Sequence, residues 1–467
     1  MGWPVVIAAN GRGIPVTESP NGTPYEISTN GYGTPVVFVD QGGLPVSSVL
    51  PVWAAGASQA WDFTASRYYN SAATPTDTHA GTIYADDVAG AWSAFAPDVL
   101  VRTTRGVQTG PTRTNGIRNN SMQGAVVGSP GALPTNWTVA SANVARQVVG
   151  VGTDAETGLP YIDLRFSGTP SATAMGNIQA EGATNAALQN QTWAHSSYVS
   201  LVGGSLSGLA SLTLRIAQYN STPSYIAEIK DGGGATIATD LAGVTGVPTR
   251  YALTGIANQA SVAYVLPYIQ FGYTVGVPVD FTLRIAAPQL ELGAFASPPI
   301  ITSGSAVTVT GNRPVIAGIA APTTEAGLAV INLRGSADTN VLWSRNDGTA
   351  GEWIGLIRDG ANLDFRVIDG GVTVADLSLG TLPVGRFGLA YTVGAGYARA
   401  EIVGGATVAP AAPATFPTVT QWAAGDGYSA ARDAYLNIER MAQAYGVVAN
   451  DATFATWLAR AASALAA

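Results

Sequence analysis

The sequence predicts a mainly β protein in which an extended N-terminal arm precedes two β-sandwich domains and a short C-terminal helix. Three observations lead to this prediction. Gly accounts for 56 of the 467 residues, which is typical of a chain with many tight turns. Short apolar segments that alternate with polar residues recur between clusters of Gly, Asn, Ser and Pro. Apolar residues at helical spacing are clearest near the end, from about residue 451 to residue 465.

The first element, residues 1–50, carries a repeated Gly-x-Pro unit followed by Val or Tyr. The copies follow one another in steps of 11, 9, 11 and 10 residues, beginning at Gly2, Gly13, Gly22, Gly33 and Gly43. Units this short cannot bury a core alone. We therefore expect either an arm that a partner orders or a flexible tail without a docking role. In the first case, the residues expected to dock onto a capsid or partner spike protein are Trp3, Pro4, Ile14, Pro15, Pro24, Tyr25, Pro35, Val36, Leu44 and Pro45.

The middle of the chain divides into a connector and a first sandwich. Residues 51–119 mix Trp, Phe and turn residues irregularly, and we interpret them as a connecting β-region. Residues 120–299 have the alternation and the turn spacing of a sandwich. The strand candidates of this sandwich are 198–202, 212–217, 225–229, 262–266 and 281–286.

A second strand-rich block fills residues 300–467, after a linker rich in Pro and Ser. Asp-Gly pairs at 359–360 and 369–370 predict two tight hairpins within it. Strand spacing is about ten residues, which is typical of an all-β sandwich. The strand candidates are 329–333, 341–344, 353–358, 362–368, 372–379, 387–393 and 397–402.

The C-terminal segment has a different pattern. Residues 432–445 fit either a helix or a final strand. Phe454 and Trp457 are spaced for one face of a helix, and Asn450 precedes them as a helix-capping residue type. The sequence therefore predicts a helix over about residues 451–465.

The composition limits the partners that we expect. Apolar residues make up 47% of the chain, enough for real cores, whereas charged residues make up only 11%. The basic residues are 21 Arg and the single Lys230, without a cluster, and the net charge is −8. This balance argues against binding of nucleic acid or of anionic membranes. The chain has no apolar run of about 18 residues and no basic segment before its first apolar stretch, so we expect neither membrane insertion nor a signal peptide.

Residue types that carry catalysis or bind metals are scarce. The chain has no Cys and only two His, His79 and His195, which are far apart in sequence. This excludes thiolate chemistry and leaves little room for a zinc site or a His-based triad. We therefore expect no enzymatic activity, no cofactor and no metal. A polysaccharide depolymerase stays open as an alternative, because a fold can bring two carboxylates together, with Asp364, Glu352 and Asp376 as default candidates.

Two segments resemble the signatures of a known family. The first covers residues 110–137, with Gly-Pro-Thr-Arg-Thr-Asn at 110–115 and Asn-Asn-Ser-Met-Gln-Gly at 119–124. The second covers residues 287–307 and begins with Ala-Pro-Gln-Leu-Glu-Leu-Gly. They resemble the opening and the close of the phage head spike fibre domain, a jelly-roll sandwich of the carbohydrate-binding type. The family also includes head spikes of gene transfer agents, which are phage-like particles.

The flanking segments carry weaker resemblances. Residues 305–465 resemble a concanavalin-like lectin sandwich, without an obvious copy of that family's calcium-binding carboxylate cluster. The Gly-x-Pro arm resembles the N-termini of phage head fibre proteins. Together the resemblances imply a homo-oligomer, a pentamer or a trimer, that is made in the bacterial cytoplasm and stands on the capsid exterior of a virion. They also imply contact with host surface polysaccharide. A tail fibre receptor-binding protein would share this chemistry and stays open.

Candidate sugar-binding residues follow from the chemistry of recognition, which needs aromatic faces beside amides and carboxylates. Most aromatic residues of the first sandwich are expected in its core, from the set Trp193, Tyr198, Tyr219, Tyr225, Tyr264, Tyr268, Phe271 and Tyr273. Loop tips carry recognition more often than strand centres do, and Tyr219 and Asn220 lie in a predicted turn. In the second sandwich, the candidates expected at loop tips are Trp343, Arg345, Asn346, Asp347, Glu352 and Trp353.

Overall fold

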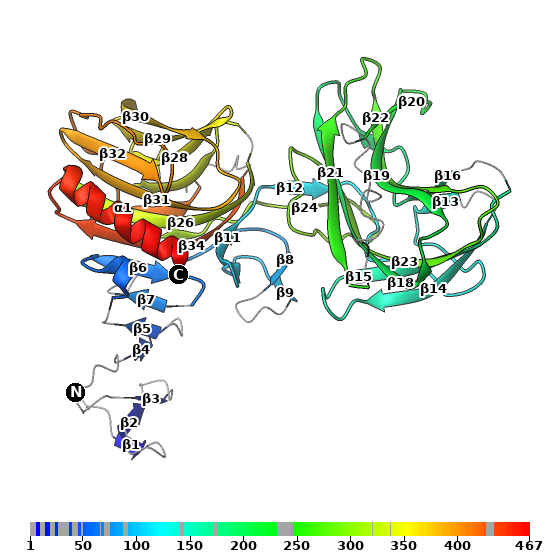
Figure 1. Cartoon of the computed structure of the whole chain (residues 1–467), viewed down its shortest axis with the longest axis horizontal. Coiled ribbons are helices and arrows are strands. Elements are labelled where there is room, and N and C mark those ends of the chain that lie inside the picture. Colours follow the sequence, from blue (N-terminus) through cyan, green and yellow to red (C-terminus); the bar gives the residue numbers. More distant parts are fainter. Residues whose placement is uncertain are drawn as a thin grey trace.

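The fold is mainly β, as predicted, with sheets that are almost entirely antiparallel and one α-helix, α1 (Asp451–Ala466), in the described part of the chain (Figure 1). The computed structural model describes residues 50–65, 67–69, 75–86, 92–140, 144–171, 175–230, 244, 246–319, 321–336, 338–425 and 434–467, and the backbone of five short strands before residue 50. No helix among these residues is long and apolar enough to cross a membrane.

The first sandwich consists of two facing sheets. One has the strand order β14 (Ala145–Thr153), β15 (Pro160–Gly168), β23 (Val279–Leu292), β18 (Thr192–Ser205), β21 (Thr249–Ile256). The other has the order β13 (Thr138–Ala140), β16 (Met175–Gln179), β22 (Tyr264–Tyr273), β19 (Leu209–Tyr219), β20 (Tyr225–Ile229), with β17 (Asn185–Ala186) paired to β22. Alternate side chains of both sheets point inward. The ring centroid of Phe166 lies 4.8 Å from that of Phe271 in the facing sheet and 5.3 Å from that of Phe281.

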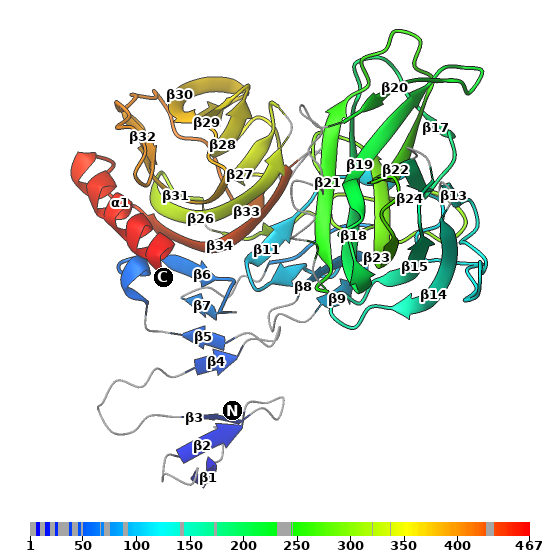
Figure 2. The same cartoon turned by 45° about the vertical axis from the view of Figure 1, so that its right-hand side comes forward.

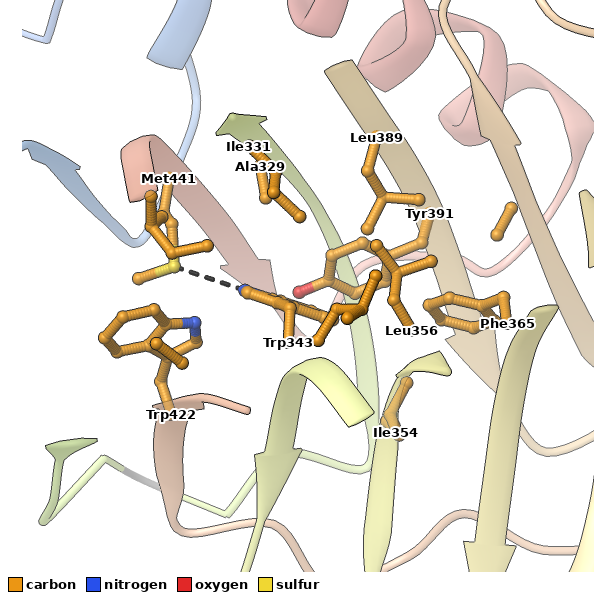
Figure 3. Packing of buried hydrophobic residues seen from close by; sticks show 14 of the residues in the cluster. Ala329, Ile331, Trp343, Ile354, Leu356, Phe365, Leu389, Tyr391, Trp422 and Met441 are labelled. Carbon is orange, nitrogen blue, oxygen red and sulfur yellow. Dashed lines mark hydrogen bonds between the residues drawn. The ribbon is translucent and has the colours of Figure 1, made fainter. Parts of the chain in front are cut away.

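The second sandwich also has two layers (Figure 2). One sheet has the order β25 (Val315–Ile316), β33 (Gln421–Ala424), β27 (Val341–Asn346), β28 (Trp353–Asp359), β29 (Asn362–Asp369), β30 (Val372–Thr381). The other has the order β32 (Tyr397–Ile402), β31 (Gly385–Gly394), β26 (Thr324–Ser336), β34 (Ala434–Tyr445), β6 (Gln59–Asp62), β7 (Arg67–Tyr69), β5 (Pro45–Ser47), β4 (Val37–Val39). Aromatic rings fill the space between the layers, among them Trp343, Phe365, Tyr391 and Trp422 (Figure 3).

Strand β34 settles the choice that the sequence left open between helix and strand. Its Leu436 and Met441 lie in the sandwich core, whereas Ala442 and Ala444 pack in a second cluster with helix α1. Both faces of the strand are therefore covered, which removes the polar alternation that marks a half-exposed strand.

Helix α1 is confirmed at the C-terminus. Asn450 is its N-cap, and its Oδ1 accepts a hydrogen bond from Thr453 N at 2.9 Å. The buried face of the helix covers the outside of the sheet that contains β26, β31 and β34 (Figure 1). The helix residues in this contact are Phe454, Trp457, Ala461 and Ala464.

The segment interpreted as a connecting region builds onto the second sandwich. Strand β6 pairs with β34, with Trp61 opposite Met441, and β11 (Gly106–Thr109) pairs with another part of β34. Its remaining strands are β7, which pairs with β6, the β8 (Ile83–Asp86)–β9 (Trp92–Phe95) hairpin, β10 (Arg102–Thr103) and β12 (Arg113–Asn115). In the arm, β5 pairs with β7 in parallel. Strands β1 (Val6–Ala9), β2 (Pro15–Glu18) and β3 (Pro24–Glu26) form a separate sheet.

The chain enters and leaves the first sandwich at one place, where β12 pairs antiparallel with β24 (Val307–Val309). Buried amides close this junction. Asn115 Nδ2 donates to the backbone oxygens of Pro288 and Ile300 at 3.3 and 3.0 Å. Asn120 Nδ2 donates to the same two oxygens at 3.1 and 2.9 Å. The two segments that carry the family resemblance therefore form one hydrogen-bonded unit, although they are far apart in sequence.

Candidate functional site

A cleft of about 650 Å³ opens on the first sandwich beside this junction. Its volume lies within the range of about 300–1,000 Å³ that is usual for small-ligand sites. The residues that line it come from β12, β17, the start of β18 and the end of β23, and we call it the tryptophan cleft. Its wall includes Thr114, Asn185, Gln191, Thr192, Trp193 and Leu292.

Strand pairing and one glycine set the shape of the tryptophan cleft. Trp193 at the start of β18 lies opposite Leu292 at the end of β23, where both strands leave the sandwich. Gly116 brings its backbone against the Asn185 amide, since a Cβ at position 116 would lie 2.0 Å from Asn185 Oδ1. Only a residue without a side chain fits that approach.

Two hydrogen-bond donors in the wall of the cleft are unpaired. Trp193 is 7% exposed, and neither its Nε1 nor Asn185 Nδ2 has a partner among the described residues. A buried unpaired donor costs about 1–3 kcal/mol. By contrast, Trp137 Nε1 donates to Asn119 O at 2.7 Å. The cleft thus holds an indole and an amide whose hydrogen bonds a ligand oxygen could complete.

Arg113 is the charged residue in the lining of the tryptophan cleft, and its charge is held within the protein. Arg113 Nε lies 3.7 Å from Oε2 of the buried Glu291. Ser297 Oγ donates to Glu291 Oε2 at 2.6 Å, and Gln289 Nε2 donates to Oε1 at 2.8 Å. Burial raises the pKa of Glu291, although the hydrogen bonds from Ser297 and Gln289 act to lower it. Arg113, Ser297 and Gln289 thus occupy the Glu291 carboxylate. The tryptophan cleft therefore offers a ligand mainly neutral amides, hydroxyls and an aromatic ring, which suits a ligand rich in hydroxyl groups.

Tyr219 and Asn220, predicted to bind sugar, lie at the end of β19. Asn220 Oδ1 accepts from Thr222 N and Ser224 N, both at 3.0 Å, so this oxygen shapes the turn. Tyr219 is half-buried and meets Tyr225 edge to face, with ring centroids 6.1 Å apart. Tyr225 is 56% exposed. The ring that this turn presents to solvent is therefore Tyr225, which the sequence did not single out.

Polar side chains continue from this turn along the outward face of the same sheet. Arg215 forms an ion pair with Glu228, and Tyr268 OH donates to Glu228 Oε2 at 2.6 Å. Burial, together with the bond to Glu228, raises the pKa of Tyr268, so its hydroxyl stays protonated. Tyr268 lies in a small cluster outside the core. The alternation in β22, where Ile269 and Phe271 point inward, was the signal for its outward position.

The loop-tip placement predicted for Trp343, Arg345 and Asn346 is wrong. All three lie in strand β27 and are buried. Trp343 Nε1 lies 3.3 Å from Met441 Sδ, and its ring centroid is 5.2 Å from that of Tyr391 (Figure 3). The strand extends further toward the turn than the alternation suggested, and the facing sheet covers Trp343 and Arg345. Asn346 lies on the other face of the strand, where it bonds with Ser344 and Gln421.

The other predicted residues of the second sandwich stabilise its loops. Trp353 is buried in β28. Asp347 Oδ1 accepts from Thr349 N and Thr349 Oγ1 at 2.8 and 2.7 Å. Glu352 accepts from two backbone amides, Gly370 N and Thr418 N, each at 2.8 Å. Both carboxylates are thus engaged within the loops, and their sugar contacts stay predictions.

The predicted docking residues fall in two groups. Pro15, Pro24, Tyr25 and Pro45 lie in strands β2, β3 and β5, of which the backbone is described. The others lie outside the described residues: Trp3, Pro4, Ile14, Pro35, Val36 and Leu44.

Of the residues weighed for catalysis, Asp364 and Asp376 lie close together on β29 and β30, whereas His79 and His195 lie apart from them and from each other. His195 is buried, its Nδ1 donates to Arg215 O at 3.1 Å, and burial lowers its pKa to about 4. His79 is buried elsewhere, with its ring nitrogens 3.1 Å from Gly81 O and Val99 O. Burial, together with the nearby charge of Asp376, raises the pKa of Asp364, and Arg366 pairs with Asp376 at 2.8 Å.

Comparison with known proteins gives weak likenesses. The chain is 14% identical to the tripod (BppUct-A-L) from the baseplate of bacteriophage Tuc2009, with a TM-score of 0.24 over 58% of this chain and 97% of that one. It is 11% identical to the N-terminal CBM22-1–CBM22-2 tandem domain of Paenibacillus barcinonensis Xyn10C, with a TM-score of 0.23 over 69% of this chain and 97% of that one. No family model and no curated protein matches the chain. At these TM-scores, the two likenesses carry no argument.

Proposed function

We propose that this chain is a structural protein of a bacteriophage or phage-like particle. It forms a head spike or fibre on the capsid exterior and binds polysaccharide on the host surface. The observation that carries the binding role is the tryptophan cleft, where the Trp193 ring and the unpaired donors of Trp193 and Asn185 line one hollow. Sugars use this combination of an aromatic surface and hydrogen bonds to hydroxyls.

The spike assignment is supported by the residues that resemble the head spike fibre domain. Asn115 and Asn120 from the opening segment bind the backbone of Pro288 and Ile300 in the closing segment. The two segments that carry the resemblance are thus joined by hydrogen bonds in the fold. Several subunits on one spike would convert weak cleft binding into avidity.

The N-terminal arm is proposed to dock onto the capsid or a partner protein by β-pairing. Strand β4 ends its sheet, and within the described part of the chain its outer edge has no partner strand. The backbone groups of such an edge can pair with an added strand.

The binding role is tested with surface polysaccharide purified from the host bacterium. The full chain should bind the immobilised polysaccharide, and the polysaccharide should keep its chain length after incubation. Shortened chains would instead establish a depolymerase, and absence of binding would contradict the proposal. Electron microscopy of intact particles locates the chain: density on the capsid is expected, whereas density on the tail would establish a tail fibre.

A further inference from the structure

A second cleft, of about 630 Å³, lies between the two sandwiches. One wall comes from β18 and β21 of the first sandwich, and the opposite wall comes from β26 and β34 of the second. The β8 strand and the β10–β11 hairpin complete it. Arginine and tyrosine dominate its lining: Arg105, Arg250, Arg334, Tyr84, Tyr198 and Tyr435. We call it the arginine cleft.

The three guanidinium groups are an unusual concentration in a chain with a net charge of −8. Arg105 and Arg334 are exposed, and within the described ranges no carboxylate forms an ion pair with either, or with Arg250. Arg250 Nη2 donates to Ser196 Oγ at 2.9 Å. Arg250 interacts electrostatically with the buried carboxylate of Glu291 and acts to lower the pKa of Glu291. The positive charge of the cleft is thus largely uncompensated.

Aromatic rings hold two of these arginines in place. The Arg250 guanidinium carbon lies 5.7 Å from the ring centroid of Tyr198, and that of Arg334 lies 5.8 Å from the ring centroid of Tyr435. Cation–π contacts of this kind orient a guanidinium without neutralising it. These contacts therefore leave hydrogen-bond donors for a ligand on Arg334, and on Arg250 apart from the Nη2 bond to Ser196.

An independent feature also points to a ligand. Gln108 lines the arginine cleft and is 3% exposed, yet its Nε2 has no hydrogen-bond partner among the described residues. Its neighbour in the lining, Asn437, is paired, since its Nδ2 donates to Thr103 Oγ1 at 3.2 Å. An unpaired buried amide is costly, and an acceptor atom in the cleft would satisfy it.

We propose that the arginine cleft binds an acidic segment of a polysaccharide, with a sugar carboxylate held by Arg105 and Arg334. Guanidinium groups match the planar geometry of a carboxylate and can bind it with two parallel hydrogen bonds. The tyrosine rings offer apolar surface to the sugar ring. That the ligand is a saccharide rests on the function proposed above. The arginine cleft adds a preference for negatively charged sugars, which the tryptophan cleft lacks.

The test uses calorimetric titration of the full chain with tri-galacturonate and with its methyl ester, which has the same shape without the charges. Tri-galacturonate should bind, more weakly as NaCl is raised, and the ester should bind at least about tenfold more weakly. Equal binding of acid and ester, or no binding of tri-galacturonate, would overturn the proposal. Competition by inorganic phosphate at equal concentration would show a general anion site and overturn the saccharide assignment.

Variants place the binding in the cleft. The double variant Arg105→Gln/Arg334→Gln should weaken tri-galacturonate binding by about tenfold or more. The matched control is Arg460→Gln, because Arg460 stacks on Trp457 at 4.8 Å but lies on helix α1, outside the cleft. Binding to the double variant with parental affinity would overturn the proposal.

A third variant separates this inference from the proposed function. Trp193→Phe alters the tryptophan cleft and should leave tri-galacturonate affinity at the parental value. A host polysaccharide that binds Trp193→Phe more weakly than the parent, together with failure of tri-galacturonate to bind, would overturn only the arginine cleft.

Discussion

Arg345 and Glu325 form an ion pair inside the second sandwich, with Arg345 Nε 3.0 Å from Glu325 Oε2 and both side chains fully buried. Tyr391 OH donates to the same carboxylate. An arginine that sequence analysis placed at a binding loop is therefore part of the core. Its charge is balanced by a carboxylate of β26 in the facing sheet, which no local pattern connects to it.

Glu325→Gln should strongly destabilise the second sandwich. The substitution leaves Arg345 as a buried charge without its counter-ion, which costs about 3–5 kcal/mol. Chemical denaturation followed by Trp fluorescence measures the loss. Asp280→Asn is the control, because it breaks an exposed ion pair with Arg165 and should change stability little. A Glu325→Gln variant as stable as the parent would contradict the prediction.

Trp193→Phe should separate binding from stability. It removes the unpaired indole donor but keeps an aromatic ring, so stability should stay unchanged or rise by up to about 1 kcal/mol, while polysaccharide affinity falls about fivefold. Trp137→Phe is the matched control, since it breaks the bond to Asn119 and should cost about 1–3 kcal/mol without changing affinity. Thermal denaturation and polysaccharide binding are measured for both. Unchanged affinity in Trp193→Phe would count against the tryptophan cleft.

The first sandwich should lose stability in mild acid because of His195. Burial lowers the pKa of His195 to about 4, whereas an unfolded His has a pKa of about 6.5. Between these values the unfolded chain binds a proton that the fold does not, so the free energy of unfolding falls as the pH drops from about 6.5 to about 4, by up to about 3 kcal/mol. In His195→Gln this part of the pH dependence should be absent. If the free energy of unfolding depends on pH identically in parent and variant, the assignment to His195 is wrong.

Removing residues 1–44 should abolish assembly onto particles and leave the sandwiches folded. The deletion removes β4, whose edge is proposed for docking, and keeps β5, because β5 pairs with β7, with Val46 opposite Tyr68, and thereby extends the sheet of the second sandwich. Circular dichroism and the thermal midpoint should match those of the full chain, whereas co-sedimentation with particles should be lost. Normal incorporation of the truncated chain would exclude docking through these residues.

Helix α1 and the Asp-Gly hairpins could be predicted because their signals are local. Asn450 caps the helix through the adjacent turn, and the hairpin between β28 and β29 closes at Asp359-Gly360. Strand β34 could not be assigned, because the core covers one of its faces and helix α1 the other. Its apolar residues therefore carry no period that distinguishes a strand from a helix.

The sites were less accessible to sequence reasoning than the fold. The tryptophan cleft joins residues such as Thr114, Trp193 and Leu292, and the arginine cleft joins Arg105, Arg250 and Arg334, each set from separate stretches of the chain. Arg345 and Arg334 have similar local contexts in alternating strands, yet one is buried and the other exposed. Burial depends on what lies across the sheet, which a single strand does not encode.

By itself, the sequence determined that this protein is built of turns and short strands, that it ends in a helix, and that thiol chemistry is excluded, because these properties follow from residue types and short-range spacing. Only the tertiary structure decided that residues 59–62 and 106–109 pair with β34, and that the first sandwich is inserted between β12 and β24. It also decided which arginines are buried and which line a cleft. The physical reason is that strand pairing and the burial of charge are set by contacts between segments hundreds of residues apart.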